Sequence, residues 1–271
     1  MNRNSRVILG VVAVVIGVSL IFSNFSLFGN NFDDSDSISL KGINEIHISG
    51  SSEAIKIIKS NQDGLNAELS GKSTGLGFTK PKVKVKKSGG KVSVEVKRSI
   101  FQLFSSSKLE LTVFINDGYH EDLSLDLSSG DLVIDDQFDI QQLDIDISSG
   151  DMTIEDIRSE EATIDVSSGS LTIHNFTGDI DGEISSGDIE IEYTSFDNDI
   201  SFDASSGSVE ITLPSNSDFD LDGHRSSGSI KVDFDLTDYE KDNDNISGTA
   251  GNGGNQIDLD VSSGSISIEE K

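Results

Sequence analysis

The most regular polar feature of the sequence is an acidic residue that recurs two positions before a Ser-Ser pair. Its six members are Asp126, Asp146, Asp165, Glu183, Asp203 and Asp260. Carboxylate oxygens suit Ca²⁺ and Mg²⁺, and paired carboxylates also cleave glycosidic bonds. Cation binding and acid–base catalysis are therefore two chemistries open to this series. The third interpretation is a solvated charged surface.

The repeat that carries these acids indicates how they are positioned. Ser-Ser-Gly occurs seven times, with spacings of 20, 19, 18, 20, 21 and 36 residues, which is typical of stacked-repeat architectures. The last gap is nearly two repeats long, and Ile246-Ser247-Gly248 is a candidate corner that divides it. The seven glycines are Gly130, Gly150, Gly169, Gly187, Gly207, Gly228 and Gly264.

Apolar residues alternate with polar ones on both sides of each Ser-Ser-Gly. In the second copy, Leu143, Ile145 and Ile147 precede the serines, and Met152 and Ile154 follow the glycine. This alternation predicts two short strands, each with one buried face. Because one such unit cannot bury its own face, we expect units to stack about 4.8 Å apart.

The sequence therefore predicts an all-β fold, a β-solenoid of about 18–21-residue repeats with Ser-Ser-Gly at aligned corners. The corner glycine would allow a positive φ without a Cβ clash. The acids listed above would then form one column, with neighbours about 5 Å apart.

Like charges on neighbouring strands repel each other, and a divalent cation would relieve that repulsion. However, the Gly-Gly-x-Gly-x-Asp repeat of calcium β-rolls and the EF-hand loop do not occur in the sequence. Glycoside hydrolysis requires two acids made unlike by their surroundings, whereas these recur identically. We expect a solvated acidic face, with weak cation binding as the alternative, and no catalytic, cofactor-binding or metal-site residue.

The cysteine and histidine content of the sequence does not indicate a catalytic or metal-binding site. The chain has no Cys, which excludes disulfides, thiolate metal sites and a Cys nucleophile. The histidines, His47, His120, His174 and His224, share no ligand spacing. The sequence predicts a protein that is not an enzyme and needs no cofactor.

Charge divides the 271-residue chain, whose net charge is −28. Residues 41–108 carry 13 Lys and Arg against 5 Asp and Glu, whereas residues 109–271 carry 5 against 40. We divide the extracytoplasmic β-solenoid, residues 41–271, into a strand-rich basic cap (41–117) and acidic repeats (118–271). The acidic surface disfavours nucleic acid as a partner.

The basic residues of the cap have two interpretations, a solvated strand face or a contact with anionic lipid or wall polymer. Nucleic acid would need aromatic residues interleaved with them, but lysine alternates here with valine. The residues are Lys80, Lys82, Lys84, Lys86, Lys87, Lys91, Lys97 and Arg98.

The N-terminus predicts a membrane anchor. Arg3 and Arg6 precede an uncharged segment, residues 7–28, whose 22 residues would span about 33 Å as a helix. Basic residues stay in the cytoplasm, so residues 1–6 are cytoplasmic, 29–40 form a linker, and the bulk is extracytoplasmic at the cell membrane. A cleaved signal peptide is the alternative, although no small-x-small site follows Phe22.

Three motifs carry a resemblance to a known family. They are Ile43-Asn44-Glu45-Ile46-His47-Ile48-Ser49-Gly50, the Ser-Ser-Gly-Asp/Ser-Ile-x-Ile units, and Gly251-Asn252-Gly253-Gly254 followed by residues 257–266. Over residues 41–271 the chain resembles the bacterial "putative adhesin" β-strand-repeat family, a domain of unknown function that includes LiaG-like membrane-anchored proteins. The resemblance implies a non-catalytic envelope protein, adhesin-like or a scaffold. An enzyme acting on envelope glycans and a cation-binding surface protein are the alternatives.

Overall fold

The computed structural model describes residues 30–74, 80–98 and 106–271, and every regular element in these ranges is a β-strand. The all-β prediction is confirmed. The 23 strands are β1 (Asn30–Ile38), β2 (Glu45–Gly50), β3 (Ala54–Ser60), β4 (Leu65–Thr74), β5 (Lys82–Ser88), β6 (Lys91–Lys97), β7 (Ser106–Asn116), β8 (Asp122–Leu127), β9 (Gly130–Ile134), β10 (Phe138–Asp139), β11 (Gln142–Ile147), β12 (Gly150–Ile154), β13 (Ile157–Val166), β14 (Ser170–Ile184), β15 (Asp188–Tyr193), β16 (Ile200–Ala204), β17 (Ser208–Leu213), β18 (Phe219–Arg225), β19 (Ser229–Val232), β20 (Leu236–Lys241), β21 (Asn245–Ala250), β22 (Asn255–Val261) and β23 (Ser265–Glu270).

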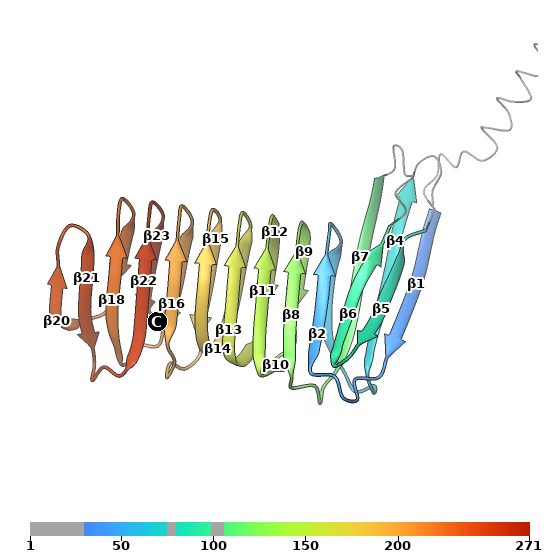
Figure 1. Cartoon of the computed structure of the whole chain (residues 1–271), viewed down its shortest axis with the longest axis horizontal. Coiled ribbons are helices and arrows are strands. Elements are labelled where there is room, and N and C mark those ends of the chain that lie inside the picture. Colours follow the sequence, from blue (N-terminus) through green and yellow to red (C-terminus); the bar gives the residue numbers. More distant parts are fainter. Residues whose placement is uncertain (1–29, 75–79, 99–105) are drawn as a thin grey trace, which may run out of the picture.

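The strands lie in two long ladders that face each other (Figure 1). The front ladder runs β5–β6–β2–β8–β11–β13–β14–β16–β22–β18–β21–β20, and it is parallel from β6 to β18. The back ladder runs β1–β4–β7–β3–β9–β12–β14–β15–β17–β23–β19 and is parallel from β7 to β19. Strand β14 is long enough to contribute to both.

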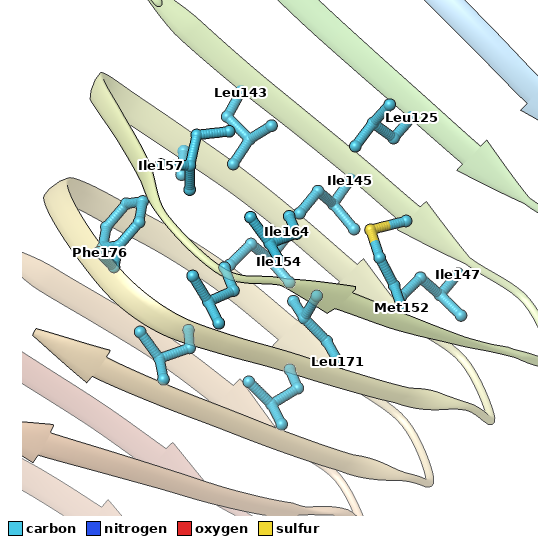
Figure 2. Close-up of a cluster of buried hydrophobic side chains, with 14 of the residues drawn as sticks. Leu125, Leu143, Ile145, Ile147, Met152, Ile154, Ile157, Ile164, Leu171 and Phe176 are labelled. Atoms are coloured by element: carbon cyan, nitrogen blue, oxygen red, sulfur yellow. The ribbon is translucent and has the colours of Figure 1, made fainter. Parts of the chain in front are cut away.

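The apolar residues of the alternating pattern fill the space between the ladders. Leu143, Ile145 and Ile147 of β11 face Met152 and Ile154 of β12, as Figure 2 shows, and all five are buried. Along the edge where each unit returns, Phe138, Ile157, Phe176 and Tyr193 also stack in register. The prediction that each strand buries one face is therefore confirmed.

The Ser-Ser-Gly corners stack through their main chains. The N–H of Ser186 donates to the carbonyl oxygen of Ser167 at 2.9 Å, and the same bond recurs between other corners. The positive φ expected at every corner glycine occurs at only two of the seven, Gly130 and Gly187. At Gly169 the requirement is space, because an added Cβ would lie 2.2 Å from the carbonyl oxygen of Gly150.

The order of the units differs from their order in the sequence. Strands β22 and β23, which carry the last Ser-Ser-Gly, lie between the fifth and sixth copies, because β22 pairs with both β16 and β18. Ile246-Ser247-Gly248 is not a corner, since it lies inside β21, antiparallel to β18. The long gap between corners is thus a hairpin extension of the sheet.

The N-terminal boundaries also differ from those expected. Residues 30–38, expected as part of a linker, form β1, which pairs along its whole length with β4. Strands β2 and β3 form a coil that stacks directly on β8 and β9. Of the basic cap, strands β4, β5, β6 and β7 lie beyond this coil, together with β1; we call these five the cap strands. No described segment is a helix long and apolar enough to cross a membrane, and the predicted anchor, residues 7–28, lies outside the described residues.

Candidate functional site

The acidic column exists as predicted. Parallel pairing places its six members side by side in the order Asp126, Asp146, Asp165, Glu183, Asp203 and Asp260. Ser49 precedes the column and His224 and Asn245 continue it, because their strands join the same ladder. The sequence repeat alone did not identify these three positions.

One member of the column, Asp146, is affected by the acids on both sides of it. Partial burial, and then the neighbouring carboxylates of Asp126 and Asp165, raise the pKa of Asp146. Among the described residues, no group of three or more His, Asp or Glu side chains is arranged to hold a metal ion. The arrangement is a row of like charges on a mostly exposed strand face.

One end of the column borders a depression of about 310 Å³. Glu183, Asp203 and Asp260 line it together with the corner residues Ser185, Ser205 and Ser262. These acids are the same repeated positions as elsewhere in the column, so the depression does not set two of them apart as acid and base.

The four histidines lie in separate places. His47 Nδ1 is 3.0 Å from Ser124 Oγ, and His224 Nδ1 is 3.0 Å from Asn245 Oδ1. The Ser124–His47 contact is the nearest approach to a nucleophile–base pair, but among the described residues no ion pair joins His47 to a carboxylate. The hydrogen bond that His224 Nδ1 donates to the side-chain oxygen of Asn245 is the main cause of the raised pKa of His224.

About half of the basic residues singled out in the cap form ion pairs with nearby acids. Lys86 and Lys97 both contact Glu95. Lys91 Nζ lies 2.6 Å from Glu45 Oε1. Sequence reasoning missed the Lys86–Glu95 and Lys91–Glu45 pairs because these residues become neighbours only when β5 pairs with β6 and β6 pairs with β2.

The remaining lysines of β5 are open to solvent. Lys82 and Lys84 are exposed and form no ion pair within the described part of the chain. The inner edge of the same strand is covered, because the N–H groups of Val83 and Val85 donate to the carboxylates of Asp34 and Asp36 on β1. Strand β5 therefore presents an exposed cationic face, while the N–H groups on its inner edge are hydrogen-bonded to β1.

A buried ion pair marks the boundary between the cap strands and the first coil. Glu53 follows Ser51-Ser52 where later coils have glycine, and it is buried. Its carboxylate accepts the N–H groups of Ser51 and Ser52, and its Oε1 lies 2.6 Å from Arg98 Nη2. Burial by itself would raise the pKa of Glu53, but these bonds outweigh burial and lower it. Arg98 is thus a structural partner and not a free cation.

The opposite end of the stack carries the exposed aromatic residue of the described chain, Tyr239, which is 50% exposed. It adjoins a groove of about 340 Å³ whose apolar lining includes Phe234, Leu236 and Ile246. Asp238, at φ 50°, interrupts the pairing of β20 with β21 there. The repeat pattern of the sequence did not predict this groove.

Comparison with protein families gives one match over most of the chain. The family model described as Toastrack DUF4097 matches residues 43–143 and 136–269. No curated protein matches the chain.

Solved structures of bacterial proteins are also similar to this chain. A "putative adhesin" from Parabacteroides merdae is 10% identical, covering 88% of this chain and 96% of that chain, with a TM-score of 0.48. A "putative lipid binding protein" from Parabacteroides distasonis is 15% identical, covering 88% and 96%, with a TM-score of 0.46. A "putative cell adhesion protein" from Clostridium sporogenes is 14% identical, covering 89% and 100%, with a TM-score of 0.38.

Proposed function

The chain belongs to the Toastrack DUF4097 family, and from this premise we propose that it is a non-catalytic interaction protein of the bacterial cell envelope. The observation that carries the proposal is the exposed cationic face of β5. Lys82 and Lys84 stay unneutralised on a chain whose net charge is −28, in which acids outnumber bases by more than two to one. Such a local excess of positive charge suits an anionic partner.

The proposed topology follows the N-terminal sequence. Residues 7–28 anchor the chain, residues 1–6 stay in the cytoplasm, and the described strands lie outside. Protease added to intact protoplasts should then degrade the repeats. Repeats that survive until the membrane is permeabilised would contradict this orientation.

The acidic repeats act as a β-solenoid spacer in this proposal. Parallel coils stack at about 4.8 Å, so each added coil lengthens the body without changing its width. The acidic column repels anionic polymers, which confines attraction to the cap strands. The partner is then an anionic component of the envelope, bearing phosphate or carboxylate groups.

Binding to an anionic polymer tests the function directly. The full chain, inserted in phosphatidylcholine nanodiscs, should bind soluble polyphosphate and isolated cell-wall fragments at about 20 mM NaCl and release them at about 500 mM. The variant Lys82→Glu/Lys84→Glu should lose this binding. The matched control Lys231→Glu/Lys241→Glu makes the same charge change at the far end of the stack and should keep it.

Two outcomes would overturn the proposal. Equal binding by both variants would remove the cap strands as the contact, and release of sugars from wall glycan by the purified chain would replace an interaction role with an enzymatic one. The described structure favours the interaction role because the column acids are repeated positions and no pair is isolated in a cleft.

A further inference from the structure

The five cap strands share one end. Strand β1 starts at Asn30 opposite Ser73, and β4 ends at Thr74 opposite Ser106, where β7 starts. Strand β5 starts at Lys82, opposite Lys97 at the end of β6. These ends form the upper limit of the cap strands in Figure 1.

Two pairs of lysines stand directly opposite each other at this end. Lys82 is in register with Lys97 in the front ladder, and Lys72 is in register with Lys108 in the back ladder. We call these four residues the lysine rim. All four are exposed, and among the described residues only Glu95 neutralises any of them, at 3.5 Å from Lys97. Directly opposed like charges destabilise a sheet. These two lysine pairs therefore lower the stability of the fold and are not needed for folding.

The two pairs point away from each other. Val83 and Leu109, which follow Lys82 and Lys108, are buried, so alternation along each strand turns the lysines outward. The ladders they belong to pack face to face at about 10 Å. The lysine rim therefore carries positive charge on the outer faces of both ladders. A planar surface that contacts the ends of the strands would contact both lysine pairs.

Acids border the rim, and among the described residues only Glu95 forms an ion pair with one of its members. Asp33 and Glu110 occupy exposed positions two residues farther from the strand ends than Asn31 and Lys108. The acidic column begins on the neighbouring coils at Asp126. An extended anionic surface would be repelled by the acidic column and attracted to the lysines of the cap strands.

Chain connectivity indicates which anionic surface lies nearest. The predicted anchor ends at residue 28, and β1 begins at Asn30 on the rim end. Two residues span at most about 7 Å. A surface tethered this closely encounters the rim at high effective concentration.

We propose that the lysine rim binds the phosphate groups of anionic phospholipids in the membrane that the chain itself enters. This inference rests on the proposed function and narrows it, since it names a lipid surface as the ligand and adds Lys72, Lys97 and Lys108 to the contact. Contacts of this kind lie within a Debye length of the membrane and weaken with salt.

Lysine footprinting of the unmodified full chain tests the proposal. The chain is inserted in nanodiscs of pure phosphatidylcholine, or with about a third phosphatidylglycerol, and amine-reactive labelling is followed by mass spectrometry. We expect Lys72, Lys82 and Lys108 to react severalfold more slowly on the anionic discs at about 50 mM NaCl, and equally on both discs at about 500 mM. Lys231 and Lys241, at the far end, serve as internal controls whose rates should not change. Equal rim rates on the two discs would overturn the inference.

A charge-swapped variant separates the lipid contact from stability. Lys72→Glu/Lys82→Glu turns each like-charge pair into an opposite-charge pair, so thermal stability should hold or rise. Protection of the remaining Lys108 on anionic discs should nevertheless disappear. Persisting protection in this variant would contradict a rim contact.

The same footprint distinguishes the two proposals. If soluble polyphosphate protects cap lysines on neutral discs while anionic discs protect none, the lipid assignment fails and the proposed function stands. If neither probe protects any cap lysine at low salt, both fail.

Discussion

Glu53 and Arg98 form an ion pair in which the carboxylate is sealed from solvent while the guanidinium stays partly exposed, with 2.6 Å between Oε1 and Nη2. In later coils, the N–H groups of the corner serines donate to carbonyl oxygens of the coil before. The coil of β2 and β3 has no such corner before it among the described residues, and the Glu53 carboxylate takes those N–H groups instead. The Glu53–Arg98 pair thus takes the place of a neighbouring corner. The row of stacked corners ends at this pair, on the side that faces the cap strands.

Replacing Glu53 should therefore cost stability in a pH-dependent way. Glu53→Gln should lower the free energy of unfolding by about 2 kcal/mol at pH 7, because charge-assisted bonds to two N–H groups and Arg98 are lost. The pKa of Glu53 is lowered in the fold, so its stabilisation is present above the ordinary value of 4.5 and disappears as pH falls through the folded value. Urea unfolding at pH 7 and below pH 4 measures both effects.

The control is Glu45→Gln, which breaks a pair with Lys91 in which both side chains are partly exposed, and it should cost under about 1 kcal/mol. A Glu53 variant no less stable than this control would show that the buried pair contributes nothing beyond a surface contact.

Repulsion between the carboxylates of the acidic column should lower the stability of the fold at neutral pH. The pKa of Asp146 is raised, mainly by partial burial and then by Asp126 and Asp165. The folded state therefore favours the protonated form, and stability from this group decreases as pH rises through the folded pKa. Asp146→Asn should raise the free energy of unfolding at pH 7 by about 0.5 kcal/mol.

Asp144→Asn provides the matched control for that gain, because Asp144 lies on the same strand and face but in register with Ser124 and Thr163, which carry no charge. Equal effects of the two substitutions on the unfolding curve would contradict repulsion along the column.

Calcium should act on this column chiefly by screening. No described group of three acidic or histidine side chains is arranged around one point, so CaCl₂ at about 1–10 mM should raise the melting temperature no more than NaCl of equal ionic strength. Calorimetry with both salts decides between them. A larger rise with Ca²⁺ would establish cation binding along the column.

The inserted position of the last coil predicts which residues cross-link. The chain has no native Cys, so two introduced cysteines form a unique pair. Asp203→Cys/Asp260→Cys joins registered neighbours of β16 and β22 and should oxidise to a disulfide, since adjacent strands lie within disulfide reach.

Asp203→Cys/His224→Cys joins the corresponding positions of the fifth and sixth copies, which the last coil separates by two strand spacings, about 9.6 Å. This pair should not oxidise, because the reach of a disulfide is about 7 Å between Cα atoms. The opposite result, read by mass spectrometry of the digested protein, would restore the sequential order of coils.

The sequence by itself determined which residues face the core and which form the column. Ile145 and Ile154 are buried and Asp146 is in register with Asp126 and Asp165 because a period of two fixes side-chain direction, and a repeat of near-constant length fixes parallel register. The segregation of basic and acidic residues was equally visible, since it depends on composition alone. These features are local, so no knowledge of distant partners is needed to predict them.

Only the tertiary structure decided which strand lies beside which. A parallel edge accepts any strand with matching alternation, so the pattern of β16 does not distinguish β18 from β22 as its neighbour. The same holds for the pairing of Lys72 with Lys108, of Val83 with Asp34, and of Glu53 with Arg98, whose partners are 36, 49 and 45 residues apart. Such contacts depend on strand order and on the ends of strands, which the two-residue period leaves open, and they are the contacts that create the lysine rim and close the stack.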